Sequence, residues 1–177
     1  RSLLRETLRV PGPEGKSFEA APATGQRGAW KVVARSGITL PVDELGARKP
    51  AVTIMVSDEG RAADRATAVK LAEAGGYVLA ADLLFTGECR PTRLSVWQHS
   101  MLLSNVGIRP LGEMADEVRS LWRWASFELG AREVTIEARG PATATAVLIA
   151  AALGDAPRGS GQLRRVVLHG LPKSFKD

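Results

Sequence analysis

The chain has 177 residues, enough for one compact domain or for part of a larger one. Apolar residues make up 45% of it, so a sizeable buried core is expected. The formal net charge is +5, but the arginines are interleaved with Asp and Glu, which argues against nucleic acid as a partner. No run of about eighteen apolar residues is present, so no membrane partner is predicted.

Cysteine and histidine are scarce. The single cysteine, Cys89, excludes an internal disulfide and a cysteine-based zinc site, and 2 histidines are too few for most metal sites. No metal is therefore predicted. The first residues, "RSLLRETLRV", do not resemble a signal peptide, and a start at Arg1 rather than Met fits a processed or excised piece. The sequence assigns no cell compartment.

The N-terminal third predicts an arm followed by strands. Residues 1–28 mix a short helical start, "SLLRETL", with Pro, Gly and Ala, and we expect an arm or linker there, with the domain over 29–177. "WKVVARSGITLPVDEL" alternates apolar and polar residues, which predicts an antiparallel pair at a sheet edge. "AVTIMVSD", 51–58, is a nearly continuous apolar run, typical of a strand buried on both faces of a parallel sheet.

The middle of the chain predicts a helix, a strand, a long loop and a second helix. "EGRAADRATAVKLAEAGG" has helical spacing and "YVLAADLLF" is a second buried strand. Residues 86–110 are rich in turn residues, and we expect a loop in which Trp97 either packs or stacks on a sugar. "LGEMADEVRSLWRWASFELG" carries the clearest apolar stripe and ends at Gly130.

The last part predicts a strand, "EVTIEARG", a tight turn at Gly140, a helix from Pro141 and a final strand, "LRRVVLHG". Parallel strands need crossover connections, so this order predicts an α/β fold with a mostly parallel sheet and helices on both faces. Ligands of such sheets lie beyond the carboxyl ends of the strands. The candidate binding residues at those ends are Asp58, Glu59, Asp82, Glu88, Arg139 and His169.

These segments resemble the α/β-hydrolase superfamily, near its acetyl-xylan-esterase-like and dienelactone-hydrolase-like branches. "LAADLLFTGE" is similar to a family pattern D-x-x-G-x-G-E, and "VTIEARGPATATAVLIAAAL" is similar to the family's strand, elbow and helix. "GIRPLGEMADEVRSLWRW" and "VVLHGLPKSF" match further family segments. The resemblance covers about residues 30–177 and implies a three-layer sandwich whose C-terminal part is truncated.

The resemblance fails at the nucleophile. The family's elbow reads G-x-S-x-G, with the serine on a strained strand-to-helix turn, and strand alternation puts Gly140 at the serine position. Glycine has no side chain to attack a carbonyl, so no acyl-enzyme forms there. The family's acid and base follow later than His169, so no catalytic residue is assigned. Ser57 is an alternative nucleophile, although with Asp58 it also fits ordinary helix capping.

The other candidates have alternatives too. Asp82 and Glu88 could form a carboxylate pair for acid–base chemistry or a divalent ion, whereas the resemblance implies that Asp82 accepts backbone N–H bonds from loops. Arg139, before a helix N-terminus, could hold a carboxylate or phosphate, or could be an ordinary surface arginine.

Three functions stay open. The first is a catalytically degenerate α/β-hydrolase domain with a binding or assembly role, for which a carbohydrate or small ester is a candidate ligand. The second is an active carboxylic-ester hydrolase completed by residues outside this chain. The third is a nucleotide-binding domain, although "VSDEGRAAD" lacks the paired glycines of a dinucleotide site, so no cofactor is predicted. The final strand also predicts self-association or a partner chain at residues 163–175.

Overall fold

The computed structural model describes residues 1–10, 18–154 and 161–171. Within these ranges seven strands form one sheet, and they are β1 (Phe18–Pro22), β2 (Ala29–Ala34), β3 (Thr39–Leu45), β4 (Ala51–Ser57), β5 (Val78–Ala81), β6 (Glu133–Arg139) and β7 (Gln162–His169). The helices are α1 (Ser2–Leu8), α2 (Arg65–Glu73), α3 (Val96–Asn105), α4 (Pro110–Phe127) and α5 (Pro141–Leu153), with a 3-10 turn η1 (Gly87–Cys89). None of these helices is long and apolar enough to cross a membrane.

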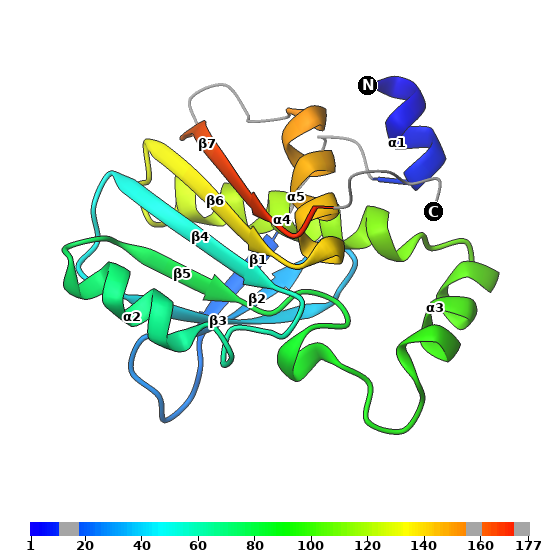
Figure 1. Ribbon diagram of the computed structural model, residues 1–177, viewed down its shortest axis with the longest axis horizontal. Coiled ribbons are helices and arrows are strands. Elements are labelled where there is room, and N and C mark those ends of the chain that lie inside the picture. Colours follow the sequence, from blue (N-terminus) through cyan, green and yellow to red (C-terminus); the bar gives the residue numbers. More distant parts are fainter. Residues whose placement is uncertain (11–17, 155–160, 172–177) are drawn as a thin grey trace.

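The sheet confirms the predicted fold class. Its strand order is β1-β2-β3-β5-β4-β6-β7, and β4, β5, β6 and β7 run parallel, while β1, β2 and β3 are antiparallel to their neighbours. Helices α4 and α5 cover one face and α2 covers the other, so the described chain forms three layers (Figure 1). The predicted segments form the antiparallel pair β2–β3, although β1 and not this pair is the edge of the described sheet.

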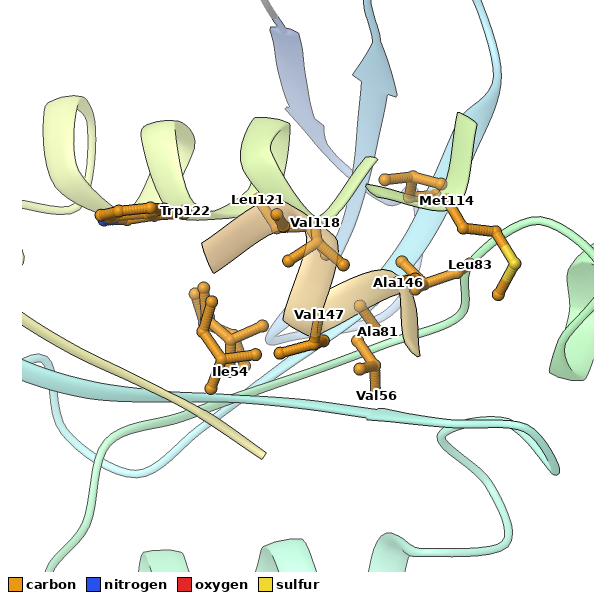
Figure 2. Close-up of a cluster of buried hydrophobic side chains, with 14 of the residues drawn as sticks. Ile54, Val56, Ala81, Leu83, Met114, Val118, Leu121, Trp122, Ala146 and Val147 are labelled. Carbon is orange, nitrogen blue, oxygen red and sulfur yellow. The ribbon is translucent and has the colours of Figure 1, made fainter. Parts of the chain in front are cut away.

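The central strand β4 is buried on both faces, which explains its unbroken apolar run. Ile54 and Val56 point toward the layer of α4 and α5, where Val118 and Val147 meet them (Figure 2). Met55, the residue between them, packs with the α2 layer instead. Successive side chains of a strand face opposite ways, so the same run supplies both cores.

Residues 18–22 correct the expectation of an arm without sheet structure. They form β1, which pairs antiparallel with β2 from Phe18 opposite Ala34 to Pro22 opposite Trp30. Proline is tolerated because β1 lies at an edge of the described sheet, where one side of the strand makes no ladder. "FEAAP" lacks the alternation of large apolar residues that would have predicted a strand. A domain boundary at residue 28 stays a prediction.

The predicted long loop over 86–110 contains a helix, α3. Ser95 begins it with a capping box: its hydroxyl accepts the N–H of Gln98 at 3.2 Å, and the Gln98 side chain accepts the N–H of Ser95 at 2.9 Å. The S-x-x-Q spacing is the signal for this helix in the sequence. The helix contains no buried residue, and it extends from one end of the molecule (Figure 1).

Candidate functional site

The carboxyl ends of β4 and β6 meet at the turn that begins α5. Gly140 is the N-cap of this helix, with φ 105° and ψ 156°, a backbone region that is open almost only to glycine. Its N–H donates to the carbonyl of His169 at 2.9 Å, which ties the turn to the end of β7. The tight turn that the sequence predicts is therefore present, and its backbone depends on glycine.

The carboxylate of Asp58 lies where a side chain at position 140 would lie. It accepts the N–H of Thr143 at 2.7 Å and the N–H of Ala142 at 3.1 Å. A Cβ atom on Gly140 would come within 2.6 Å of Asp58 Oδ2, closer than real Cβ atoms approach a neighbour. The positive end of the α5 dipole favours this charge, so Asp58 is a cap that also closes the elbow.

Pro141 leaves the first residue of α5 without a backbone N–H. In α/β-hydrolases the residue after the nucleophile supplies a backbone N–H to the oxyanion hole. Proline has no N–H, and the next two N–H groups of α5 are bound to Asp58. The turn thus offers neither a nucleophile nor this oxyanion donor. The dipeptide Gly140-Pro141 carries both signals in the sequence, although by itself the proline indicates only a good helix start.

Neither Ser57 nor Cys89 is placed as a nucleophile at this turn. Ser57 is buried, its hydroxyl accepts the N–H of Glu59 at 3.3 Å, and it lines a small cavity under α2 rather than the space above Gly140. Its hydroxyl has no hydrogen bond to a histidine in the described part of the chain. Burial raises the pKa of Cys89 to about 12, so its thiol is protonated and a poor nucleophile at neutral pH.

Asp82 and Glu88 are separated by an arginine. Asp82 is buried and accepts the N–H of Arg61 at 2.6 Å, the N–H of Glu88 at 3.0 Å and the Arg61 guanidinium. The same guanidinium donates to Glu88 Oε1 at 2.7 Å. Burial lowers the pKa of Arg61, but the charges of Asp82 and Asp43 outweigh it and raise that pKa.

This arrangement suits loop support better than metal binding. The cation between the carboxylates takes the place that a divalent ion would need. In the described ranges no group of three or more His, Cys, Asp or Glu side chains could hold a metal ion. Asp82 accepts backbone N–H bonds, in line with the role that the resemblance implies.

The side chains of Arg139, His169 and Glu59 make their contacts with other side chains and not with the N–H groups of α5. Arg139 donates to Glu137 at 2.7 Å and approaches Asp64 at 3.8 Å, so its charge is already paired. His169 lies 3.3 Å from the same Glu137 carboxylate. The anion position predicted for Arg139 is held by Asp58. The Glu59 side chain is 72% exposed and lies 3.5 Å from Arg90 at the surface.

A cavity of about 280 Å³ lies between the strand ends, α3 and α4, and we call it the strand-end pocket. Its lining is mostly apolar and consists of Asp58, Leu84, Phe85, Thr86, Arg90, Val96, Met114 and Ala142. The Arg90 guanidinium donates to the carbonyls of Asp58 at 2.7 Å and Phe85 at 3.3 Å, which fixes two pocket walls to each other. The charged side chains that line the pocket, Asp58 and Arg90, are thus already hydrogen-bonded within the protein.

Phe85 lines this pocket, and its backbone has an unfavourable conformation. Its φ is 68°, in the left-handed region that a bulky side chain rarely adopts. Phe85 stands where the pattern D-x-x-G-x-G-E has its first glycine, and its positive φ is one that glycine adopts freely. The ring lies edge-on to His99, with centroids 6.5 Å apart. Sequence reasoning does not single out either Phe85 or Met114.

No family model and no curated protein matches this chain. Solved structures do. Dienelactone hydrolase from Anabaena variabilis ATCC 29413 aligns with 86% of this chain and 63% of its own length at 17% identity and a TM-score of 0.51. Acetyl xylan esterase 1 from Thermoanaerobacterium sp. JW/SL YS485 aligns with 86% of this chain and 53% of its own length at 15% identity and a TM-score of 0.55. The chain thus spans less than two thirds of either protein, and over that span it has an α/β-hydrolase-like fold.

Proposed function

We propose that the chain is a catalytically degenerate α/β-hydrolase-like domain that binds a ligand without hydrolysing it. The observation that carries the proposal is the Asp58 carboxylate over Gly140. Acyl transfer by this fold needs a nucleophile and donors for the developing oxyanion. Gly140 supplies no nucleophile, Pro141 supplies no donor, and Asp58 occupies the next two N–H groups of α5.

The ligand we propose is a small carboxylic ester or a similar acyl compound in the strand-end pocket. The pocket's apolar wall of Leu84, Phe85 and Met114 suits an acyl group, whereas a sugar would need more convergent hydrogen-bond donors. Trp97, the residue considered for sugar stacking, does not line this pocket and is 70% exposed on α3. Carbohydrate is therefore the less favoured of the two candidate ligands.

The other two functions are less well supported. Residues outside this chain could add an acid and a base, but they would not put a hydroxyl at position 140 or remove Asp58 from its place. A dinucleotide site needs a glycine-rich turn whose N–H groups can approach a pyrophosphate at a helix N-terminus. At α5 those N–H groups bind Asp58.

Hydrolysis and binding are measured separately. Turnover of p-nitrophenyl acetate and of acetylated xylan is expected to equal the buffer rate. Catalytic turnover that persists through many equivalents of substrate would contradict the degenerate assignment. Acetylation of a surface group would stop after about one equivalent.

Binding is measured as the thermal shift caused by ethyl butyrate. Ala142→Leu fills the pocket from the exposed first turn of α5, and Ala152→Leu changes an exposed alanine at the far end of the same helix as a control. We expect ethyl butyrate to raise the Tm of the wild type and of Ala152→Leu but not of Ala142→Leu. An equal shift in all three proteins would exclude the strand-end pocket as the binding site.

A further inference from the structure

Helix α3 presents most of its apolar side chains to solvent, and of its leucines only Leu103 packs against the core. Trp97 is 70% exposed and Leu102 is 54% exposed, whereas His99, Ser100 and Ser104 are only partly exposed. His99 Nδ1 is a buried atom with no hydrogen-bond partner in the described ranges. A surface helix of a globular domain normally has the opposite arrangement, with its apolar stripe on the core.

Exposed apolar residues are concentrated at this helix. Among the residues that the structure describes, nine large hydrophobic side chains are exposed, and six of them lie at or next to α3. These six form what we call the α3 stripe, and they are Leu94, Val96, Trp97, Met101, Leu102 and Val106. Isolated exposed apolar residues are ordinary, but a contiguous group of this kind marks an interaction surface.

Charge indicates the kind of surface that the stripe meets. Residues 94–108 include no Asp, Glu, Lys or Arg, and exposed arginines flank them at Arg93 and Arg109. A third arginine, Arg9, donates to the carbonyl of Gly107 at 2.7 Å, just beyond the C-terminal end of α3. An uncharged apolar stripe with a tryptophan and flanking cations has the composition of a helix that lies in an anionic membrane interface.

A second copy of this chain fits the stripe less well. Two α3 helices packed antiparallel would place Arg93 of one copy near Arg109 of the other, and these like charges repel. A bilayer that contains anionic lipid supplies apolar depth for the stripe and negative headgroups for the arginines. The absence of a long apolar run, from which no membrane partner is predicted, bears only on spanning the bilayer.

We propose that the α3 stripe docks on the surface of an anionic lipid bilayer. The helix lies in the interface plane with Trp97, Met101 and Leu102 among the acyl chains near the headgroups, and with Arg93 and Arg109 at the phosphates. This inference rests on α3 and its flanks and not on the elbow at Gly140; of the stripe, Val96 also lines the strand-end pocket.

Co-sedimentation with vesicles tests the proposal. The whole chain is mixed with vesicles of phosphatidylcholine alone or with phosphatidylserine added, at two salt concentrations. We expect binding to the vesicles that contain phosphatidylserine and release at high salt, because salt screens the arginine contacts. Arg93→Gln and Arg109→Gln should each weaken this binding about fivefold, from about 1 kcal/mol per basic residue near such a surface.

Matched variants distinguish binding through the α3 stripe from non-specific adsorption through any exposed hydrophobic residue. Trp97→Ser and Leu102→Ser change stripe residues, and Phe127→Ser changes a 53% exposed phenylalanine at the end of α4. All three are surface changes, and circular dichroism checks that each variant folds. We expect the two stripe variants to lose vesicle binding and Phe127→Ser to keep it.

Three results would overturn the proposal. One is no binding of the wild type to either kind of vesicle, and another is equal loss in Phe127→Ser. The third is lipid-free light scattering in which the wild type is a dimer and Trp97→Ser is a monomer, which would make a second copy the partner of the stripe. None of these results would bear on the lack of hydrolysis.

Discussion

Gly140 and Asp58 depend on each other. The glycine makes room for the carboxylate, and the carboxylate in turn binds the first N–H groups of α5. Gly140→Ser should therefore cost roughly 1–3 kcal/mol of the free energy of unfolding, because φ 105° is unfavourable for serine and its Cβ meets Asp58. Urea unfolding measures this cost.

A control variant separates the cost of the positive φ from the cost of the contact with Asp58. Gly130 has φ 73°, and a Cβ atom at this position would have no other atom within 4 Å, so Gly130→Ser reports the cost of positive φ alone. Gly140→Ser should be the more destabilising of the two, and it should not hydrolyse activated esters. Hydrolysis well above background would instead show that His99 or His169 can act as a base at this turn.

The same contact predicts a non-additive double mutant. Asp58→Ala alone should cost about 0.5–2 kcal/mol, because α5 loses its cap. In the Asp58→Ala background, Gly140→Ser should cost less than in the wild type, because the carboxylate no longer blocks the new side chain. Strict additivity of the two costs in urea unfolding would mean that Asp58 does not occupy the space above Gly140.

Glu117 predicts a pH dependence of stability. It is fully buried on α4, its Oε2 accepts the N–H of Leu84 at 2.8 Å, and burial together with the nearby carboxyls of Glu113 and Asp116 raises its pKa to about 8. The thiol of Cys89 is protonated and adds no second negative charge. Between an unfolded pKa near 4.5 and a folded pKa of about 8, the folded state binds more protons, so stability falls as pH rises.

Thermal unfolding at pH 5 and pH 8 measures this effect. Glu117→Gln keeps an acceptor for Leu84 and removes the titration, so its Tm relative to the wild type should rise between pH 5 and pH 8, by roughly 2–4 °C per kcal/mol. Glu128→Gln, at the exposed end of α4, is the control and should show no such trend. An unchanged difference between Glu117→Gln and the wild type would refute the buried titration.

Among the elements, β7 has an open edge. In the described ranges it pairs with β6 alone, and Leu163, Val166 and Leu168 are only partly buried against the core. We propose that a second copy covers this edge, because unpaired strand edges favour association. The described N-terminal helix α1 does not cover the edge of β7, because it packs on α4. The interface predicted over 163–175 extends beyond the described residues.

Light scattering over a range of concentrations tests this association. We expect a dimer or higher oligomer at micromolar concentration, with β7 amides protected from hydrogen exchange only in the assembled form. A monomer at every concentration with protected β7 amides would show that another part of the same chain covers the edge.

At the scale of the whole molecule, periodicity predicts the fold better than it predicts the site. The apolar runs of β4 and β5 and the stripe of α4 come from burial, which a sequence pattern records directly. Periodicity misses β1 and α3 because neither is buried enough to leave such a pattern. The capping spacing of Ser95 and Gln98 is the one local signal of α3.

The site depends on contacts between residues far apart in the sequence. The sequence shows that a serine is absent at Gly140, but Asp58 reaches that turn from a distant part of the chain, across the pairing of β4 with β6. Arg139 also turns out to be paired with Glu137 on the same strand, while Asp58 holds the position at α5 that an anion would take. The fold's topology decides which side chains bind each other, and the composition and spacing of the sequence do not reveal these pairs.

On the proposed function, this α/β-hydrolase-like domain has no working serine nucleophile. Incubation of the whole chain with a fluorophosphonate probe, followed by intact-mass and peptide mass spectrometry, tests it most directly, with an active serine esterase as the positive control. We expect the chain to stay unlabelled while the control is labelled completely. Stoichiometric labelling of any serine, with Ser57 the first to examine, would contradict it.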